Sequence, residues 1–347
     1  MIKHYFIIIL LSSMIIILGY KKLNAGGANL ENTKKLTEAS LLSSLFIIIT
    51  LVLLGSGFGY ALYLDFVVPI FFCIILLKCD IKYSILSGIT SLFIIGIVFG
   101  DIGTSIWITQ SIILGILCGV LISKKGTILD DILIGTILGI IIMVFIDIYA
   151  SNLIGYSFIK EFQGYAKAFK YKDFSMVIYY IFIGIYPMGT IFSIYILSLL
   201  FTNKLNIAKN KTKTKINIIN NFKFCLRFIC LSKNVFYASF IYIFLVEIIN
   251  LLNFNISGVY LKTIIISIEY ICFYFIIRDS YTLIQNYIIL NYKRGVYIKI
   301  VTIILLFMLI IMFKLSTLIL ILITLILDKK QNIRLRQFII INNYIHR

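Results

Sequence analysis

Long apolar stretches separated by short polar gaps fill most of the chain from residue 40 to residue 327. About 20 apolar residues in an α-helix cross the roughly 30 Å hydrocarbon core of a bilayer. Eleven stretches approach that length, and most gaps between them are too short to fold independently. The stretches are 5–20, 40–57, 61–77, 84–100, 105–122, 130–150, 176–202, 235–253, 261–291, 298–313 and 315–327. The pattern predicts an all-α protein, a polytopic transmembrane helical bundle.

Lysine and arginine are concentrated in alternate gaps, which predicts the orientation of the spans. The densest run lies between Lys204 and Lys233, and the carboxyl-terminal tail from Lys329 is also basic. Such residues are retained on the cytoplasmic side of a membrane, so we expect a cytoplasmic carboxyl terminus. A single long helix over 298–327 is the alternative to two spans, but it would place the basic tail outside, and we therefore keep the two apart at Lys314.

Composition agrees with a membrane location and narrows the chemistry. Hydrophobic residues make up 61% of the chain, and the mean hydropathy is +1.06. The net charge of +18 is carried by bases placed between apolar runs, so we expect the lipid bilayer as the partner and no nucleic acid. Only two histidines are present, and the six cysteines lie mostly inside apolar runs. We expect structural thiols, no metal site and no cofactor.

Three segments do not fit a simple succession of spans. Residues 1–32 form an amino-terminal hydrophobic extension that is an uncleaved span or a signal, with Asn24-Ala25-Gly26 as a weak cleavage candidate. The gap 151–175 has aromatic residues at helical spacing, which fits an interfacial lid or a plain amphipathic connector. The basic segment 203–234 is predicted to be a cytoplasmic linker ending in a surface helix near Phe222, either solvated or placed against anionic lipid headgroups.

Ionisable residues inside the predicted spans are the first candidates for function, because charge in hydrocarbon is costly. Four of them, on two neighbouring spans, form a candidate intramembrane charge network: Glu247, Glu269, Arg278 and Asp279. Two interpretations stay open, a structural set of ion pairs that fixes helix register and a solute or proton site. Arg278 and Asp279 point to different helix faces, so we expect them to have separate partners.

A candidate solute pocket lies at the predicted outer ends of the spans between residues 40 and 202. It combines a glycine-rich corner, aromatic side chains and two carboxylates: Gly57, Tyr60, Tyr63, Asp101, Trp107 and Asp147. Ala39 and Ser43 have the small-xxx-small spacing that lets another helix approach closely, which fits internal packing or a coupling face toward another subunit. No HExxH, GxSxG or Walker sequence is present, so we expect no enzymatic activity.

Three separate segments of the chain carry a family resemblance. Asn32-Thr33-Lys34-Lys35-Leu36-Thr37-Glu38-Ala39-Ser40-Leu41-Leu42 resembles the start of the YybS-like family of bacterial multispanning membrane proteins, and the likeness continues to about residue 202. Later, Ser280 to Asn291 around Gln285, and Leu325-Ile326-Leu327-Asp328 followed by Arg334, resemble the closing segments of that family. Asn286 and Leu325 stand where the family has glycine.

The amino-terminal half of that family is similar to S subunits of energy-coupling-factor transporters. The resemblance implies a six-span S-subunit-like domain at 33–202, followed by the linker 203–234, a second transmembrane bundle at 235–328 and a tail at 329–347. It also implies the bacterial cell membrane, a small-molecule solute in an outward pocket, and a coupling subunit with a separate ATPase. The second bundle has no counterpart in a typical S subunit.

Two functions follow as hypotheses. The first is a small-solute-binding subunit of a transport system that lacks its own ATPase. The alternative is a non-transporting membrane scaffold or regulator that binds a partner through its cytoplasmic segments.

Overall fold

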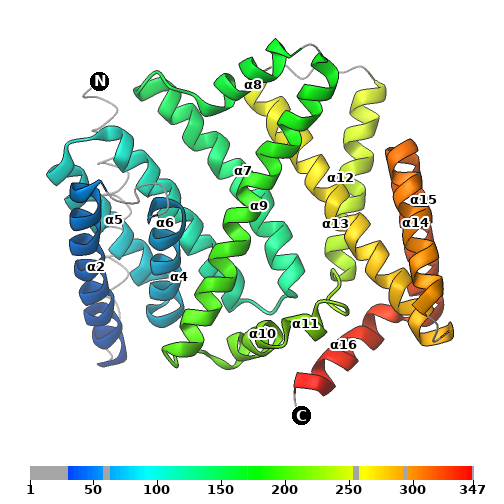
Figure 1. Ribbon diagram of the computed structural model, residues 1–347. Coiled ribbons are helices and arrows are strands. Elements are labelled where there is room, and N and C mark those ends of the chain that lie inside the picture. The colour runs from blue at the N-terminus through cyan, green and yellow to red at the C-terminus, as the bar shows by residue number, and fades with distance from the viewer. Residues whose placement is uncertain (1–29, 58–62, 170, 253–257, 293–294, 346–347) are drawn as a thin grey trace. The chain divides into compact units, whose positions relative to one another are not determined.

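The computed structural model describes residues 30–57, 63–169, 171–252, 258–292 and 295–345, and every regular element in these ranges is a helix (Figure 1). The predicted all-α class is therefore confirmed. The first apolar stretch and the cleavage candidate at Asn24-Ala25-Gly26 lie outside the described residues.

Seven of the described helices are long and apolar enough to cross a membrane, which makes the chain a multi-pass integral membrane protein. They are α2 (Leu30–Ser56), α5 (Ile81–Phe99), α6 (Ile102–Ser123), α7 (Ile128–Leu153), α9 (Lys172–Lys204), α12 (Lys233–Leu251) and α13 (Val259–Tyr292). The predicted span 61–77 is not among the seven, because its described residues form a π-helix, η1 (Tyr63–Val67), that continues into the short helix α4 (Val68–Cys79).

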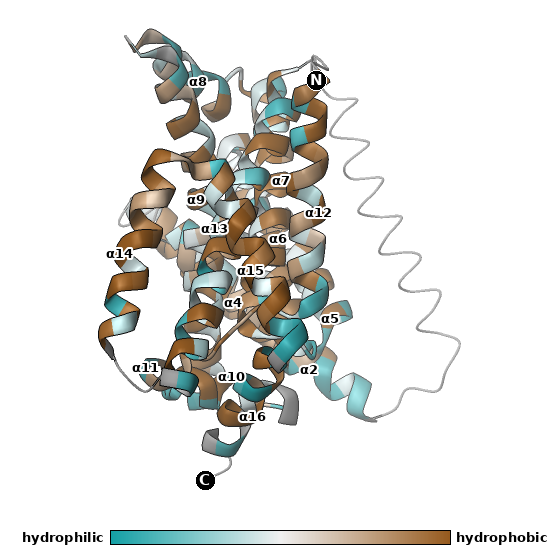
Figure 2. Cartoon of the chain, turned by 90° about the vertical axis from the view of Figure 1, so that its right-hand side faces the viewer, coloured by the Kyte–Doolittle hydropathy of each residue, from teal (hydrophilic) through white to brown (hydrophobic). Residues whose placement is uncertain are grey.

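The last two apolar stretches form separate helices, as predicted, but neither is among the seven helices that are long and apolar enough to cross a membrane. Helix α14 (Gly295–Ile311) ends one residue before α15 (Phe313–Gln331), and Met312 between them leaves the helical conformation with φ −137° and ψ 69°. The two helices pack on each other and on α13, around Leu320 and Ile284. Figure 2 shows α14 as apolar along most of its length.

The chain divides into two compact units, residues 1–120 with 204–207, and residues 121–203 with 208–347. In unit 1, α2 packs on α4 and α5 around Phe46, Phe72 and Ile95. Gly115 of α6 lies against the backbone of Pro69, because a Cβ there would be 2.3 Å from the Pro69 carbonyl oxygen. This close contact brings α6 onto α4.

Unit 2 is organised around α13, which packs on α7, α12, α14, α15 and α16 (Ile333–Ile345). Gly184 of α9 also meets α13, since a Cβ at this position would lie 2.9 Å from Ile271. The sequence groups residues 128–202 with the preceding spans, whereas the compact units place all of them with the later helices. The reason is physical: residues on α7 and α9 pack against residues on α13 that lie far along the chain.

The two long gaps also contain helices. Residues 158–168 form α8 (Phe158–Ala168), whose buried side includes Ile159 and Ala166. The basic segment is more ordered than the predicted linker: it contains α10 (Asn210–Asn220) and the one-turn helix α11 (Phe222–Cys225). The surface helix predicted near Phe222 is thus shorter than expected, and the longer helix lies before it.

Candidate functional site

The residues predicted to form an outer pocket belong to both units. Gly57, Tyr63, Asp101 and Trp107 lie in unit 1, Asp147 lies in unit 2, and Tyr60 lies outside the described residues. Gly57 has φ +67° and open space around it, which fits a turn. The Tyr63 hydroxyl is hydrogen-bonded to Thr50, and Trp107 is 37% exposed. Whether these side chains border one cavity stays a prediction.

Asp101 has a local structural role at the start of α6. Its carboxylate accepts hydrogen bonds from the Thr104 hydroxyl and from the backbone N–H groups of Gly103 and Thr104, the latter at 3.1 and 2.9 Å. Hydrogen bonding by Thr104 is the largest cause that lowers the pKa of Asp101. A carboxylate in this position satisfies N–H groups that have no partner inside the helix.

Asp147 holds the start of α8. Its Oδ1 accepts a hydrogen bond from the Phe158 N–H at 2.8 Å, and its Oδ2 accepts one from the Ser157 hydroxyl at 2.5 Å. Ser157 in turn accepts from the Lys160 N–H and so caps α8. The second carboxylate of the predicted pocket thus connects α7 to α8 within unit 2.

Ala39 lies in the apolar core of unit 1, and Ser43 faces α5. Both are buried, with 3% and 5% exposure, and the Ser43 hydroxyl lies 2.8 Å from the Ser91 hydroxyl. This stripe of α2 therefore packs internally.

The four residues of the predicted charge network lie at two separate places in unit 2. Glu247 is paired with Lys314, with 2.7 Å between Oε1 and Nζ, and Glu269 has these two residues as its charged neighbours. Asp279 is fully buried and paired with Arg334, 2.7 Å away. Arg278 does not share that partner, and among the described residues its buried Nη1 has no hydrogen-bond acceptor.

A cavity of about 210 Å³ lies beside Glu247 and Lys314, bordered by α9, α12, α13 and α15. Its polar lining consists of Asn250, Glu269 and Lys314. Glu269 is 5% exposed, whereas the Lys314 side chain is 64% exposed. The cavity is thus lined by the ammonium of Lys314, which reaches the surface, and by the carboxyl group of Glu269, which is buried.

Most of the cavity wall is aromatic or aliphatic. Four rings line it: Tyr180, Tyr270, Phe273 and Phe313. The rings of Phe273 and Phe313 are in edge contact, with centroids 5.2 Å apart, and this contact joins α13 to the start of α15. By the charge distribution of the sequence this is the predicted outer end of unit 2, because α12 ends and α15 begins there.

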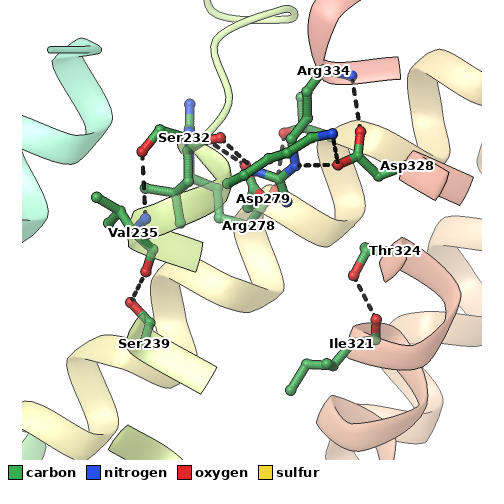
Figure 3. Close-up of polar contacts among 12 residues, drawn as sticks. Ser232, Val235, Ser239, Arg278, Asp279, Ile321, Thr324, Asp328 and Arg334 are labelled. Atoms are coloured by element: carbon green, nitrogen blue, oxygen red, sulfur yellow. Dashed lines mark hydrogen bonds and ion pairs between the residues drawn. The ribbon is translucent and has the colours of Figure 1, made fainter. Parts of the chain in front are cut away.

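A second polar cluster lies where α16 meets α13 (Figure 3). Arg334 is 7% exposed, and its guanidinium contacts several groups. It donates to Asp279 and to the Leu231 carbonyl, pairs with Asp328 at 3.5 Å, and lies over the Phe236 ring at 4.6 Å from the centroid. A buried guanidinium that pairs with two carboxylates and a backbone carbonyl in this way fixes the position of α16.

Lys215 forms the third polar contact, between α10 and the corner that joins α6 to α7. Its ammonium donates to the carbonyls of Leu121 and Lys124, both at 2.9 Å, and to the Asp131 carboxylate at 2.6 Å. The Tyr195 hydroxyl also donates to Asp131. Burial lowers the pKa of Lys215, and the charge of Asp131 acts in the opposite direction.

Sequence reasoning identified Glu247, Glu269 and Asp279 but missed their partners. In the sequence, Lys314 looks like a turn residue, Arg334 like part of a basic tail and Lys215 like one of many linker lysines. One signal in the sequence could have found these partners. Each buried carboxylate needs a cation nearby, and only a few lysines and arginines lie close enough to the ends of the spans to reach the carboxylates.

No family model matches the chain, and no curated protein or solved structure matches it either.

Proposed function

We propose that this integral membrane protein binds a small solute in the cavity of unit 2, as the binding subunit of a transport system whose ATPase is a separate protein. The observation that carries the proposal is Glu269, a carboxyl group with 5% exposure that lines a cavity whose wall is mostly aromatic and aliphatic. Buried ionisable groups in membrane spans are costly, and they are usually retained because they serve a function.

The position of the cavity supports a binding role. It lies where four helices meet, which is a common location for ligand sites in helical bundles. Its volume of about 210 Å³ is below that of a drug-sized site, so a solute of a few non-hydrogen atoms is the appropriate size class. The wall combines aromatic rings with a few polar groups, the composition typical of small-molecule sites.

The transport part of the proposal rests on the resemblance of residues 33–202 to S subunits of energy-coupling-factor transporters. The YybS-like pattern ends with Asp328 and Arg334, and these two residues form an ion pair in unit 2. That contact provides a physical reason for the spacing, since it joins the end of α15 to α16. The coupling subunit and the ATPase remain partners that the proposal requires. Because Ala39 and Ser43 pack internally, we do not assign the coupling contact to them.

The proposal is tested by native mass spectrometry of the full chain, purified from host membranes in mild detergent. We expect a small molecule to be retained by the unmodified protein and lost from Glu269→Gln. Glu161→Gln is the matched control, because Glu161 is exposed on α8 and does not line the cavity. Equal retention by both variants, or no retained molecule in the unmodified protein, would contradict the proposal.

One observation favours the alternative function, a scaffold or regulator. Helix α16 has three exposed apolar side chains, Leu335, Phe338 and Ile339, with exposures of 59%, 58% and 46%. These side chains offer a surface for a partner beyond the last span. If Phe338→Ser abolishes biological activity while Glu269→Gln leaves it intact, the scaffold function is the correct one.

A further inference from the structure

We propose that the solute bound in the unit 2 cavity is a small organic cation with one ammonium group, and that Lys314 occupies part of its site until the solute binds. This inference rests on the proposed function and adds the chemical class of the ligand.

Two carboxyl groups and one ammonium group meet beside the cavity. Glu247 pairs with Lys314, and Glu269 is hydrogen-bonded to Glu247. That hydrogen bond requires a proton, so the two carboxyl groups together carry one negative charge, which a single ammonium group balances. A carboxylate in apolar surroundings needs such a positive charge nearby, because desolvation of an unpaired ion is very costly. A solute cation supplies that charge when it takes the place of Lys314.

The aromatic walls of the cavity, like its carboxyl groups, favour binding of an ammonium group. Four aromatic rings line the same cavity as Glu269: Tyr180, Tyr270, Phe273 and Phe313. Aromatic faces attract ammonium ions, and the attraction increases when the ion is desolvated. The combination of a buried carboxylate with several aromatic rings therefore favours an organic cation over an anion or a neutral solute.

A divalent metal ion fits this site less well. Calcium takes six to eight oxygen ligands, and magnesium requires nearly octahedral oxygen coordination. Within the described residues no group of three or more His, Cys, Asp or Glu side chains comes together. Two carboxylates beside aromatic rings match the single charge and the apolar stem of an alkylammonium ion.

Lys314 occupies the place that such a solute needs. Its ammonium lies 2.7 Å from the Glu247 carboxylate, yet its side chain is 64% exposed. A lysine on a long exposed stem is able to turn into solvent at small cost, since its charge is then hydrated. We therefore expect Lys314 to compete with the solute for the carboxyl groups, so that a single ammonium group balances the site in both the empty and the bound states.

The test uses three probes of matched size that differ in charge: n-butylammonium, n-butanol and butyrate. The full chain in nanodiscs of neutral lipid is titrated with each probe up to about 10 mM at constant ionic strength, and the shift of the unfolding temperature reports binding by linkage. We expect the largest shift with n-butylammonium. Glu269→Gln should weaken that binding about 10- to 100-fold, the range of a charge-assisted hydrogen bond.

A second variant makes the test independent of any damage caused by Glu269→Gln. Lys314→Met removes the competing ammonium, so n-butylammonium should bind more tightly to it than to the unmodified protein. Glu161→Gln should bind as the unmodified protein does. Opposite effects at positions 269 and 314 are the expected signature of charge, because general destabilisation would weaken binding in both variants.

The outcomes separate this inference from the proposed function. If n-butanol or butyrate binds at least as well as n-butylammonium and Glu269→Gln weakens that binding, the cavity binds a solute but the cation class is wrong. Weaker n-butylammonium binding by Lys314→Met would also contradict the inference, as would no response to any probe. A small molecule retained in the mass spectrometry experiment would leave the proposed function standing in each of these cases.

Discussion

Lys215 shows how one buried cation connects several elements. Its ammonium has acceptors in the last turn of α6 and in the first turn of α7, where the partial charges of helix ends favour a cation and an anion respectively. Four acceptor oxygens surround it: those of Leu121, Ile122, Lys124 and Asp131. The Lys215 ammonium therefore both caps the carboxyl-terminal end of α6 and forms an ion pair with Asp131.

Replacing Lys215 with methionine should destabilise the protein by about 3 kcal/mol, because removal of one partner leaves Asp131 buried without its counter-charge. The remaining hydrogen bond from Tyr195 keeps the cost at the low end of the range for such pairs. Denaturant unfolding in detergent measures the change. Lys213→Met is the matched control, since Lys213 is exposed on the same helix and should change stability by less than about 0.5 kcal/mol. Equal effects of the two variants would refute the cap.

Cys230 should be almost inert toward maleimide in the folded protein. Burial, and then the charge of Asp279, raises the pKa of its thiol to about 12. At pH 8 the thiolate is then scarcer than in a free cysteine by roughly three orders of magnitude, and the thiolate is the nucleophile. A chain with Cys230 as its single cysteine should label only after unfolding. Lys213→Cys in a cysteine-free chain is the exposed control, and comparable rates for both would disprove the expected protection.

The stability of helix α8 depends on the cap at its amino terminus. The Ser157 hydroxyl accepts from the Lys160 N–H at 3.2 Å and donates to Asp147. Phe162 then packs against Tyr179 and Phe182, with ring centroids 5.8 and 4.8 Å apart. The aromatic residues that suggested an interfacial segment thus divide between packing positions and exposed ones such as Tyr165.

Ser157→Ala should loosen α8 by about 1 kcal/mol, the usual cost of losing a serine cap. Hydrogen exchange of the amides in 158–168 should become about fivefold faster, since local opening governs exchange. Ser151→Ala on α7 serves as the control because Ser151 does not cap α8. Unchanged exchange in α8 would show that packing alone holds the helix.

The sequence predicted the helices better than it predicted which charged side chains pair with each other. Apolar stretches of spanning length predicted the all-α class, and Lys314 with the basic tail predicted the separation of α14 from α15, because both are local properties of the chain. The ion pairs Lys215–Asp131 and Arg334–Asp279 join residues 84 and 55 positions apart. Such contacts depend on how helices pack, and periodicity along one segment contains no information about them.

The same distinction explains the location of the cavity. The sequence predicted a solute pocket near Asp101 and Asp147, two carboxylates that the structure uses for capping α6 and holding α8. Glu269 was recognised as costly, but the packing of α9 and α15 beside it could not be predicted from α13 alone. A small-solute site in a bundle is formed by several helices together, so its position follows from tertiary packing.

The orientation of the whole molecule rests on the distribution of basic residues. In residues 208–234 and 329–347 the chain has no acidic residue. The carboxylates Asp131 and Asp279, which lie against these segments, are buried and paired. The charges exposed at this end of unit 2 are therefore predominantly positive, which is the feature that retains a segment in the cytoplasm.

Two matched lysine-to-cysteine variants test this orientation directly. Lys167 lies exposed on α8 and Lys213 lies exposed on α10, and each is replaced by cysteine in a cysteine-free chain. A membrane-impermeant maleimide applied to intact cells should label Lys167→Cys, while Lys213→Cys should label only after the membrane is permeabilised. The reverse pattern would place the basic segments outside, and the cavity beside Lys314 would then open toward the cytoplasm. The positive-inside rule acts on the lysines of the short segments between spans. Moving those lysines to the opposite gaps, with the spans unchanged, should therefore reverse the orientation of the protein in the membrane.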